Sequence, residues 1–245
     1  MTTYFDRAGY WRELAAANAL SLTVTTDPVA VGRLHTLSAR AALRLGRVEA
    51  ALEHHRLASQ IYERLGDEVN QALNHSAMGK CLSESGAVLA ALEHHRRALE
   101  LFRRHANVAG QASTLNNIGF NLARLGNYSE ALPFCQEAIT LARQLGNRKG
   151  EAHCADSLGY IRRGLGEHER AIEHYHRAVA LFVESGAKIA QASAWTSLGD
   201  TYAETGNLEA ARDAWQFALE IHEQLDGDGD GADATRLRIA SGSLP

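Results

Sequence analysis

Residues 112–150 read ASTLNNIGFNLARLGNYSEALPFCQEAITLARQLGNRKG, and this stretch decides the fold class. Apolar residues at three- and four-residue spacing run through residues 112–125, and the pair Gly-Asn at 126–127 then breaks the pattern. A second periodic run covers about residues 129–145 and stops at another Gly-Asn pair, which is typical of a helix C-terminus. The stretch therefore predicts two helices that form a hairpin.

The hairpin pattern recurs every 40 residues along the chain. Four ladders of small residues keep this register: Gly79, Gly119, Gly159 and Gly199; Gly46, Gly86, Gly126, Gly166 and Gly206; Ala51, Ala91, Ala131, Ala171 and Ala211; and Ala58, Ala98, Ala138, Ala178 and Ala218. The ladders predict five repeats, at residues 32–71, 72–111, 112–151, 152–191 and 192–231. Because a single hairpin cannot bury both of its faces, the repeats must stack. The ladder that begins at Gly79 and the two alanine ladders are interpreted as close contacts where a larger side chain would overpack neighbouring helices.

The ends of the chain depart from this pattern. Residues 1–31 resemble the leading helix of an incomplete repeat, and residues 232–245 predict a short terminal helix with a tail. Tyr4, Phe5, Tyr10 and Trp11 form an aromatic cluster with no complete repeat before it, so we expect part of its apolar area to stay exposed.

Composition restricts the class of protein. The 245 residues are 45% hydrophobic and include three prolines, which favours an all-helical protein with a sizeable core. The 25 Lys and Arg residues against 29 Asp and Glu residues give a net charge of −4, which argues against direct nucleic-acid binding. Three cysteines without CxxC spacing predict neither disulfides nor a zinc site, and Cys135 and Cys154 are expected to be buried and inert. Without a signal-peptide pattern or an apolar run of about 18 residues, we expect a soluble cytoplasmic protein with no membrane partner.

The order Leu-Gly, Gly, Ala, Ala, at Leu158-Gly159, Gly166, Ala171 and Ala178, resembles the tetratricopeptide repeat (TPR). The resemblance implies an all-α fold, a right-handed superhelical solenoid of helical hairpins. The period of 40 exceeds the usual period of about 34 residues, which predicts a longer second helix and loop in each repeat.

Longer segments are similar to the C-terminal TPR region of the actinomycete antibiotic regulatory protein (SARP) family of transcriptional regulators. These segments are AGYWRELAAANALSL (8–22), LNNIGFNLARLGNYSEALPFCQEAI (115–139), ADSLGYIRRGLGEHERAIEHYHRAVALF (155–182) and SLGDTYAETGNLEAARDAWQFALEIHEQL (197–225). In that family a DNA-binding segment and a nucleotide-binding domain precede the repeats. This chain carries no GxxxxGK[ST] phosphate loop and no winged-helix region before its repeats. The resemblance therefore implies the repeat region of such a regulator or a free-standing relative.

No residue pattern indicates catalysis or a cofactor. GxSxG and HExxH strings are absent from the sequence, so we do not expect an enzyme. The pairs His54-His55 and His94-His95 lie in copies of one helical string, and adjacent helix positions point about 100° apart, which disfavours a shared metal ion. We expect one histidine of each pair to pack inside and the other to face solvent. The Asp-Gly run at 226–231 imitates half of an EF-hand loop but lacks the glutamate at its twelfth position, so no metal is predicted.

The TPR resemblance also predicts a concave groove lined by the first helix of each hairpin. The groove residues selected as a partner-binding site are Arg33, Arg40, Arg44, Lys80, Asn116, Asn117, Phe120, Arg124, Asp156, Tyr160, Arg163 and Asp200. Their charge runs from positive in the first repeat to negative in the fifth, and two aromatic residues stand in the middle. Because aromatic residues and arginine are enriched in interfaces, we predict that a protein or peptide segment binds here. A solvated face with accidental charges is the alternative.

These features predict a non-enzymatic protein-interaction and regulatory module. Within a larger regulator, its N-terminal aromatic cluster would contact the adjoining nucleotide-binding domain. The alternatives are a free-standing TPR adaptor that binds a peptide segment and a receptor for a small signal ligand.

Overall fold

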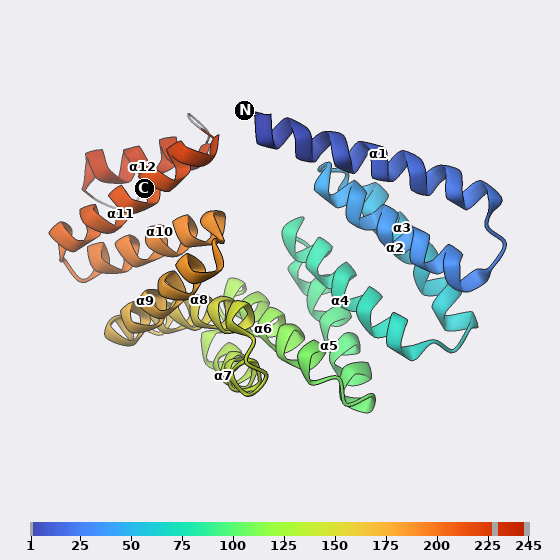
Figure 1. Ribbon diagram of the computed structural model, residues 1–245. Helices are drawn as coiled ribbons and strands as arrows, with labels where there is room; N and C mark the ends of the chain where they lie inside the picture. The colour runs from blue at the N-terminus through green and yellow to red at the C-terminus, as the bar shows by residue number, and fades with distance from the viewer. Residues whose placement is uncertain (1, 227–229, 243–245) are drawn as a thin grey trace. The chain divides into compact units, whose positions relative to one another are not determined.

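The computed structural model describes the backbone of residues 2–226 and 230–242 and the side chains of residues 9–225 and 231–242. Within these ranges every regular element is an α-helix, and no strand is present (Figure 1). The helices are α1 (Thr2–Val24), α2 (Pro28–Arg44), α3 (Val48–Arg64), α4 (Glu68–Glu84), α5 (Val88–Arg104), α6 (Val108–Arg124), α7 (Tyr128–Gln144), α8 (Arg148–Gly164), α9 (His168–Ser185), α10 (Lys188–Glu204), α11 (Leu208–Asp226) and α12 (Asp230–Ser241). The predicted fold class, an all-α solenoid of helical hairpins, is confirmed.

Helix and turn lengths explain the 40-residue period. Helices α2 to α8 each have 17 residues, and three residues separate each helix from the next. The predicted longer second helix and loop are therefore wrong, because both helices of a hairpin share the extra length and the turns stay short. Helix α6 begins at Val108, four residues before the apolar periodicity starts at Ala112.

The ladder that begins at Gly79 and the two alanine ladders lie at close contacts between helices, as predicted, whereas the ladder that begins at Gly46 lies in turns where a Cβ atom would meet nothing. A Cβ atom built on Gly79 would lie 2.6 Å from the ring of His95, and one on Gly159 would lie 2.7 Å from the ring of Tyr175. All ten residues of the two alanine ladders are fully buried. A larger side chain at these positions would push neighbouring helices apart.

Turns between helices use left-handed backbone. Gly126, after α6, has a φ of 82°, and Gly146, after α7, has a φ of 62°, a conformation that glycine adopts without steric strain. Ala106, between α5 and α6, has a φ of 50° and is the non-glycine residue with positive φ in the described part of the chain. This turn carries a strain that its glycine counterparts avoid.

The chain divides into two compact units, and the division falls within α6. The N-terminal unit (Met1–Asn117) holds α1 to α5 and the start of α6. Its core contains two clusters: Ala72, Ala98, Leu101 and Phe102; and Ala42, Ala51 and Cys81.

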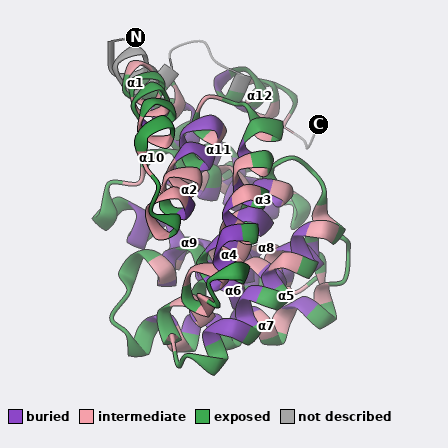
Figure 2. Cartoon of the chain, turned by 90° about the vertical axis from the view of Figure 1, so that its right-hand side faces the viewer, coloured by how far each residue is buried: buried purple, intermediate pink, exposed green. Residues whose placement is uncertain are grey.

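The C-terminal unit (Ile118–Pro245) holds the end of α6 and α7 to α12. Tyr175, Leu198 and Ala214 form part of its core, and Trp195 and Tyr202 pack against them. Along individual helices, buried residues form stripes beside exposed ones (Figure 2). None of the helices in the described ranges combines the length and the apolar character that crossing a bilayer requires.

Candidate functional site

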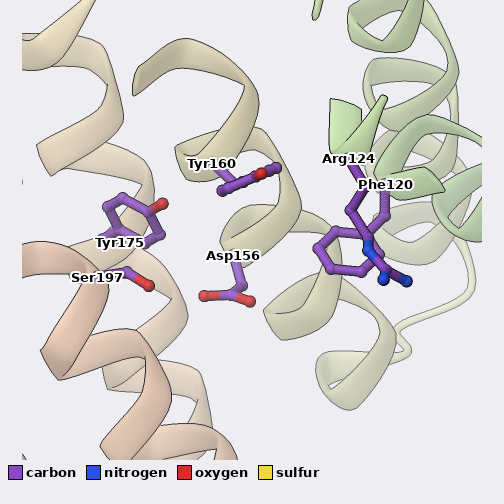
Figure 3. A pocket seen from close by; sticks show the side chains of 6 residues that line it. All are labelled: Phe120, Arg124, Asp156, Tyr160, Tyr175 and Ser197. Atoms are coloured by element: carbon purple, nitrogen blue, oxygen red, sulfur yellow. The ribbon is translucent and has the colours of Figure 1, made fainter. Parts of the chain in front are cut away.

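The C-terminal unit contains a cavity of about 330 Å³, here called the aromatic pocket. Its lining residues are Phe120, Arg124, Asp156, Tyr160, Tyr175 and Ser197 (Figure 3). They come from four helices, α6, α8, α9 and α10. Four of the twelve residues selected from the sequence thus line one cavity, because each of the two groove-lining helices contributes a pair spaced by four residues.

Two aromatic rings form one side of the aromatic pocket. The ring centroids of Phe120 and Tyr160 lie 5.9 Å apart with an interplanar angle of 51°. Tyr160 also meets Tyr128 of α7 edge-on, at 6.1 Å between centroids. Phe120 and Tyr160 are both half-buried, and burial raises the pKa of the Tyr160 hydroxyl. The rings therefore offer apolar surface to an occupant while Tyr160 is held by its neighbours.

Asp156 lines the same cavity and lacks a compensating partner. Its carboxylate forms no hydrogen bond or ion pair with any residue in the described part of the chain, and it is directed into the aromatic pocket (Figure 3). Burial raises the pKa of the Asp156 carboxyl to about 7, because the charged form loses water without gaining a cation. A carboxylate in this setting is ready to accept a hydrogen-bond donor.

Tyr175 and Ser197 also line the aromatic pocket, and neither belongs to the residues selected from the sequence. Tyr175 is 1% exposed, and its hydroxyl oxygen is buried without a hydrogen bond of normal geometry in the described structure. Burial raises the pKa of Tyr175 well above its usual range, and the charge of Asp156 adds to this. The position could have been found from the repeat, because residues 95, 135, 175 and 215 each pack beside the glycine sixteen residues earlier. A tyrosine at this position carries its hydroxyl past that contact.

Arg163 and Asp200, also selected for the groove, take part in ion pairs within the C-terminal unit. Arg163 on α8 donates to both carboxylate oxygens of Glu204 on α10, with Nη2 2.7 Å from Oε1. Asp200 is 8% exposed and accepts hydrogen bonds from Trp215 Nε1 at 3.0 Å and from Arg238 Nε at 2.9 Å. The acidic end of the predicted charge gradient is therefore neutralised, because α8 and α12 place arginines against both carboxylates.

The basic residues predicted at the other end of the groove lie in the N-terminal unit. Arg33 and Lys80 are exposed on α2 and α4. Arg40 and Arg44 are also exposed, and each guanidinium carbon lies 6.0 Å from the ring centroid of Trp11 on α1. The leading helix thus provides an aromatic surface for two of the four basic side chains, which the repeat pattern did not indicate.

Asn116 and Asn117 lie in the N-terminal unit next to the division within α6, and both side chains are half-buried. In the predicted N-terminal aromatic cluster, Tyr10 is 57% exposed and Trp11 is half-buried, with their rings edge-on at 5.1 Å. The side chains of Tyr4 and Phe5 lie outside the described residues.

The histidine pairs differ from their predicted arrangement. His55 and His95 are buried, as expected for one member of each pair. Their neighbours do not simply face solvent: the Nδ1 atoms of His54 and His35 lie 3.0 Å apart, and the equivalent pair in the next repeat, His94 and His75, repeats this geometry at 2.9 Å. The described residues contain no group of three or more potential metal ligands, and the Asp-Gly run lies mostly outside them.

The cysteines are buried and unbridged, as expected for Cys135 and Cys154. Burial raises the pKa of the Cys154 thiol to about 12, so at neutral pH it remains a thiol with little nucleophilic character.

Comparison with known proteins identifies the repeat. Two family models, both described as tetratricopeptide repeat, match the chain: one at residues 31–104 and 110–182, the other at residues 192–223. No curated protein sequence matches the chain.

Several solved structures share the fold at low sequence identity. BtubC (BKLC) from P. vanneervenii is 18% identical, with a TM-score of 0.70 over 94% of each chain. A Rap protein in complex with competence and sporulation factor is 16% identical, with a TM-score of 0.72 over 91% of this chain and 67% of that one. A Signal Transduction ATPase with Numerous Domains (STAND) protein with a tetratricopeptide repeat sensor, from Pyrococcus horikoshii, is 20% identical, with a TM-score of 0.71 over 89% of this chain and 34% of that one. The structures agree with the family match, which covers most of the sequence: the chain belongs to the tetratricopeptide repeat family.

Proposed function

We propose that the chain is a non-enzymatic protein-interaction module that binds a peptide segment of a partner protein in the aromatic pocket. The observation that carries this proposal is the convergence of Phe120, Tyr160 and Asp156 on one cavity. Half-buried aromatic side chains anchor many protein interfaces, because they bury a large area at a small loss of side-chain entropy. A polar group among them fixes the orientation of the bound segment.

We further propose that the module is the C-terminal sensor or effector-interaction region of a SARP-type transcriptional regulator involved in antibiotic biosynthesis. The segments quoted from the sequence support this assignment, as does the shared fold with a STAND protein that has a tetratricopeptide repeat sensor. The reading frame upstream of Met1 tests it. An in-frame nucleotide-binding domain would support the assignment, whereas a chain translated from Met1 alone would favour a free-standing adaptor.

The size of the aromatic pocket supports a second candidate, a receptor for a small signal ligand. Its volume of about 330 Å³ lies at the lower end of the range typical of small-molecule sites. In that case the occupant is a free molecule and not part of a protein chain.

Selection of phage-displayed random peptides against the chain tests the main proposal. Binders are then measured on Phe120→Ala and Tyr160→Ala, with Glu220→Ala on an exposed part of α11 as the matched control. We expect each aromatic replacement to weaken binding by about 2 kcal/mol, roughly 30-fold, and the control to leave it unchanged. Circular dichroism should show that all three variants keep their helicity, because these positions lie outside the small-residue ladders.

The proposal is wrong if the selected peptides bind the aromatic variants as tightly as the wild type. A small-ligand receptor would instead yield no peptide that depends on Phe120 or Tyr160, but would show a thermal shift with the protein-free fraction of a cell extract. That shift should be smaller in Tyr160→Ala.

A further inference from the structure

Asp156, which is half-buried, differs from the buried carboxylates of the C-terminal unit. Glu151 is buried and accepts hydrogen bonds from Arg143 and Arg177 at 3.0 Å, and Asp200 has its own arginine and indole partners. Asp156 has no such partner in the described part of the chain. A shielded carboxylate without a partner destabilises the fold, so its presence in a cavity indicates a partner that arrives from outside.

The surroundings of Asp156 select the charge of that partner. The faces of the Phe120 and Tyr160 rings carry negative potential and attract a cation, and the hydroxyls of Tyr175 and Ser197 can accept hydrogen bonds from it (Figure 3). An anionic occupant would be repelled by the carboxylate, and an apolar one would bury it further without compensation. Arg124 is exposed at the edge of the cavity, and no hydrogen bond or ion pair joins its guanidinium to Asp156 in the described part of the chain.

We propose that the aromatic pocket accepts a cationic side chain, arginine or lysine, of the bound peptide segment, with Asp156 as its ion-pair acceptor and the rings of Phe120 and Tyr160 packed along its aliphatic part. This inference rests on the proposed function and specifies the partner: a segment with a basic anchor residue. The exposed edge of the cavity lets the rest of the segment continue across the surface.

The pair also predicts a pH dependence of binding. Because free Asp156 titrates near pH 7, a cation that binds its ionised form releases a proton at lower pH. Affinity should therefore rise about fivefold between pH 6 and 7 and about twofold more by pH 8, and level off above. The other charged or titratable groups that line the cavity are Arg124, Tyr160 and Tyr175. None of them changes charge in this range, because guanidinium stays protonated and burial raises the pKa of both tyrosines. His153, one turn earlier on α8, packs against the ring of Phe182, at 5.1 Å between centroids.

The test uses phage-displayed peptides with a fixed central Arg, Lys, Gln or Leu and random flanks. The tightest Arg binder is then synthesised with Arg, with citrulline (its uncharged isostere) or with norleucine. On the wild type we expect the Arg peptide to bind at least tenfold more tightly than the citrulline peptide, and the advantage to grow from pH 6 to pH 8. In Asp156→Asn the advantage and its pH dependence should vanish, whereas Asp213→Asn, an exposed aspartate of α11, should keep both.

Each outcome distinguishes this inference from the proposed function. Binders that depend on Phe120 and Tyr160 but show no basic preference, or a preference that Asp156→Asn leaves unchanged, would overturn the inference and leave the proposed function standing. If no selected peptide depends on the two rings, both the inference and the proposed function are wrong. Urea unfolding provides the folding control: Asp156→Asn should be at least as stable as the wild type, since it removes a shielded charge without a partner.

Discussion

Replacing Ala106 with glycine should stabilise the N-terminal unit. Ala106 occupies the turn position that glycine holds in three other repeats, at Gly66, Gly146 and Gly186. The same two backbone hydrogen bonds fix the turn in each case. Here the amide of Ala106 donates to the carbonyl oxygen of Arg103 at 3.1 Å, and the amide of Asn107 donates to the carbonyl oxygen of Phe102 at 2.9 Å. Since the turn holds φ at 50°, the alanine side chain is kept in the left-handed region.

The magnitude follows from two opposing effects. An L-residue with a side chain loses roughly 1–2 kcal/mol in the left-handed conformation, and glycine avoids this loss. Glycine also gives the unfolded chain more freedom, which destabilises the fold by roughly 0.4–1 kcal/mol. The Ala106 methyl group is exposed, so its removal loses no packing. The net expectation for Ala106→Gly is a stabilisation of about 0.5–1 kcal/mol.

Urea unfolding followed by circular dichroism measures this difference. Two controls fix the sign. Gly146→Ala puts a methyl group into the same turn one repeat later and should lose about 0.5–1 kcal/mol, and Ala17→Gly, at an exposed position inside α1, should lose about as much through helix propensity. An Ala106→Gly variant that unfolds at the wild-type midpoint or below it, with both controls behaving as stated, would refute the reasoning.

Three further substitutions test the packing and the charges. Burial lowers the pKa of His95 to about 4, and both of its ring nitrogens are buried without a partner in the described structure. The unfolded chain therefore binds a proton more readily than the folded one, and stability should fall as the pH drops from about 6.5 towards 4. In urea titrations, His95→Phe should raise stability at pH 7 and reduce the loss at low pH. Burial alone would raise the pKa of Glu151, but hydrogen bonds from Arg177 and Arg143 lower it. In the same assay, Glu151→Ala should reduce the free energy of unfolding by about 1–3 kcal/mol at pH 7 and by less below pH 4. In Gly159→Ala the new methyl group meets the Tyr175 ring, so we expect a loss of about 1–3 kcal/mol and weaker peptide binding, measured by urea unfolding and fluorescence anisotropy.

The repeat architecture could be predicted because steric contacts repeat with the sequence. Gly79 and Gly159 leave room for rings sixteen residues later, and such contacts recur wherever two helices of a hairpin meet. Helix starts were less visible, since the first turn of each helix carries polar or exposed residues without apolar periodicity. The side chain of Asn147 accepts a hydrogen bond from the amide of Gly150 at 2.9 Å, and such N-cap residues were a usable signal for the true start of α8.

The candidate site could be predicted in part, because position within the repeat decides which way a side chain points. Phe120, Asp156 and Tyr160 lie on one cavity for this reason. The roles of Arg40 and Arg44 could not be predicted, since Trp11 belongs to a leading helix outside the 40-residue register.

Asp156 and Asp200 show that the repeat predicts where a side chain points but not which partner it has. Both were selected because they occupy groove positions. Asp200 accepts hydrogen bonds from Trp215 and Arg238, whereas Asp156 has no hydrogen-bond or ion-pair partner in the described ranges. The difference does not come from their own repeat positions. Arg238 lies on α12, beyond the last hairpin, and Trp215 stands where the other repeats have a histidine, a cysteine or a tyrosine. Orientation is thus a property of the repeat, whereas pairing is a property of the neighbours. A carboxylate that already accepts hydrogen bonds within the fold has little capacity left for a ligand. A search for binding residues in this solenoid should therefore begin with the carboxylate that its neighbours leave unpaired.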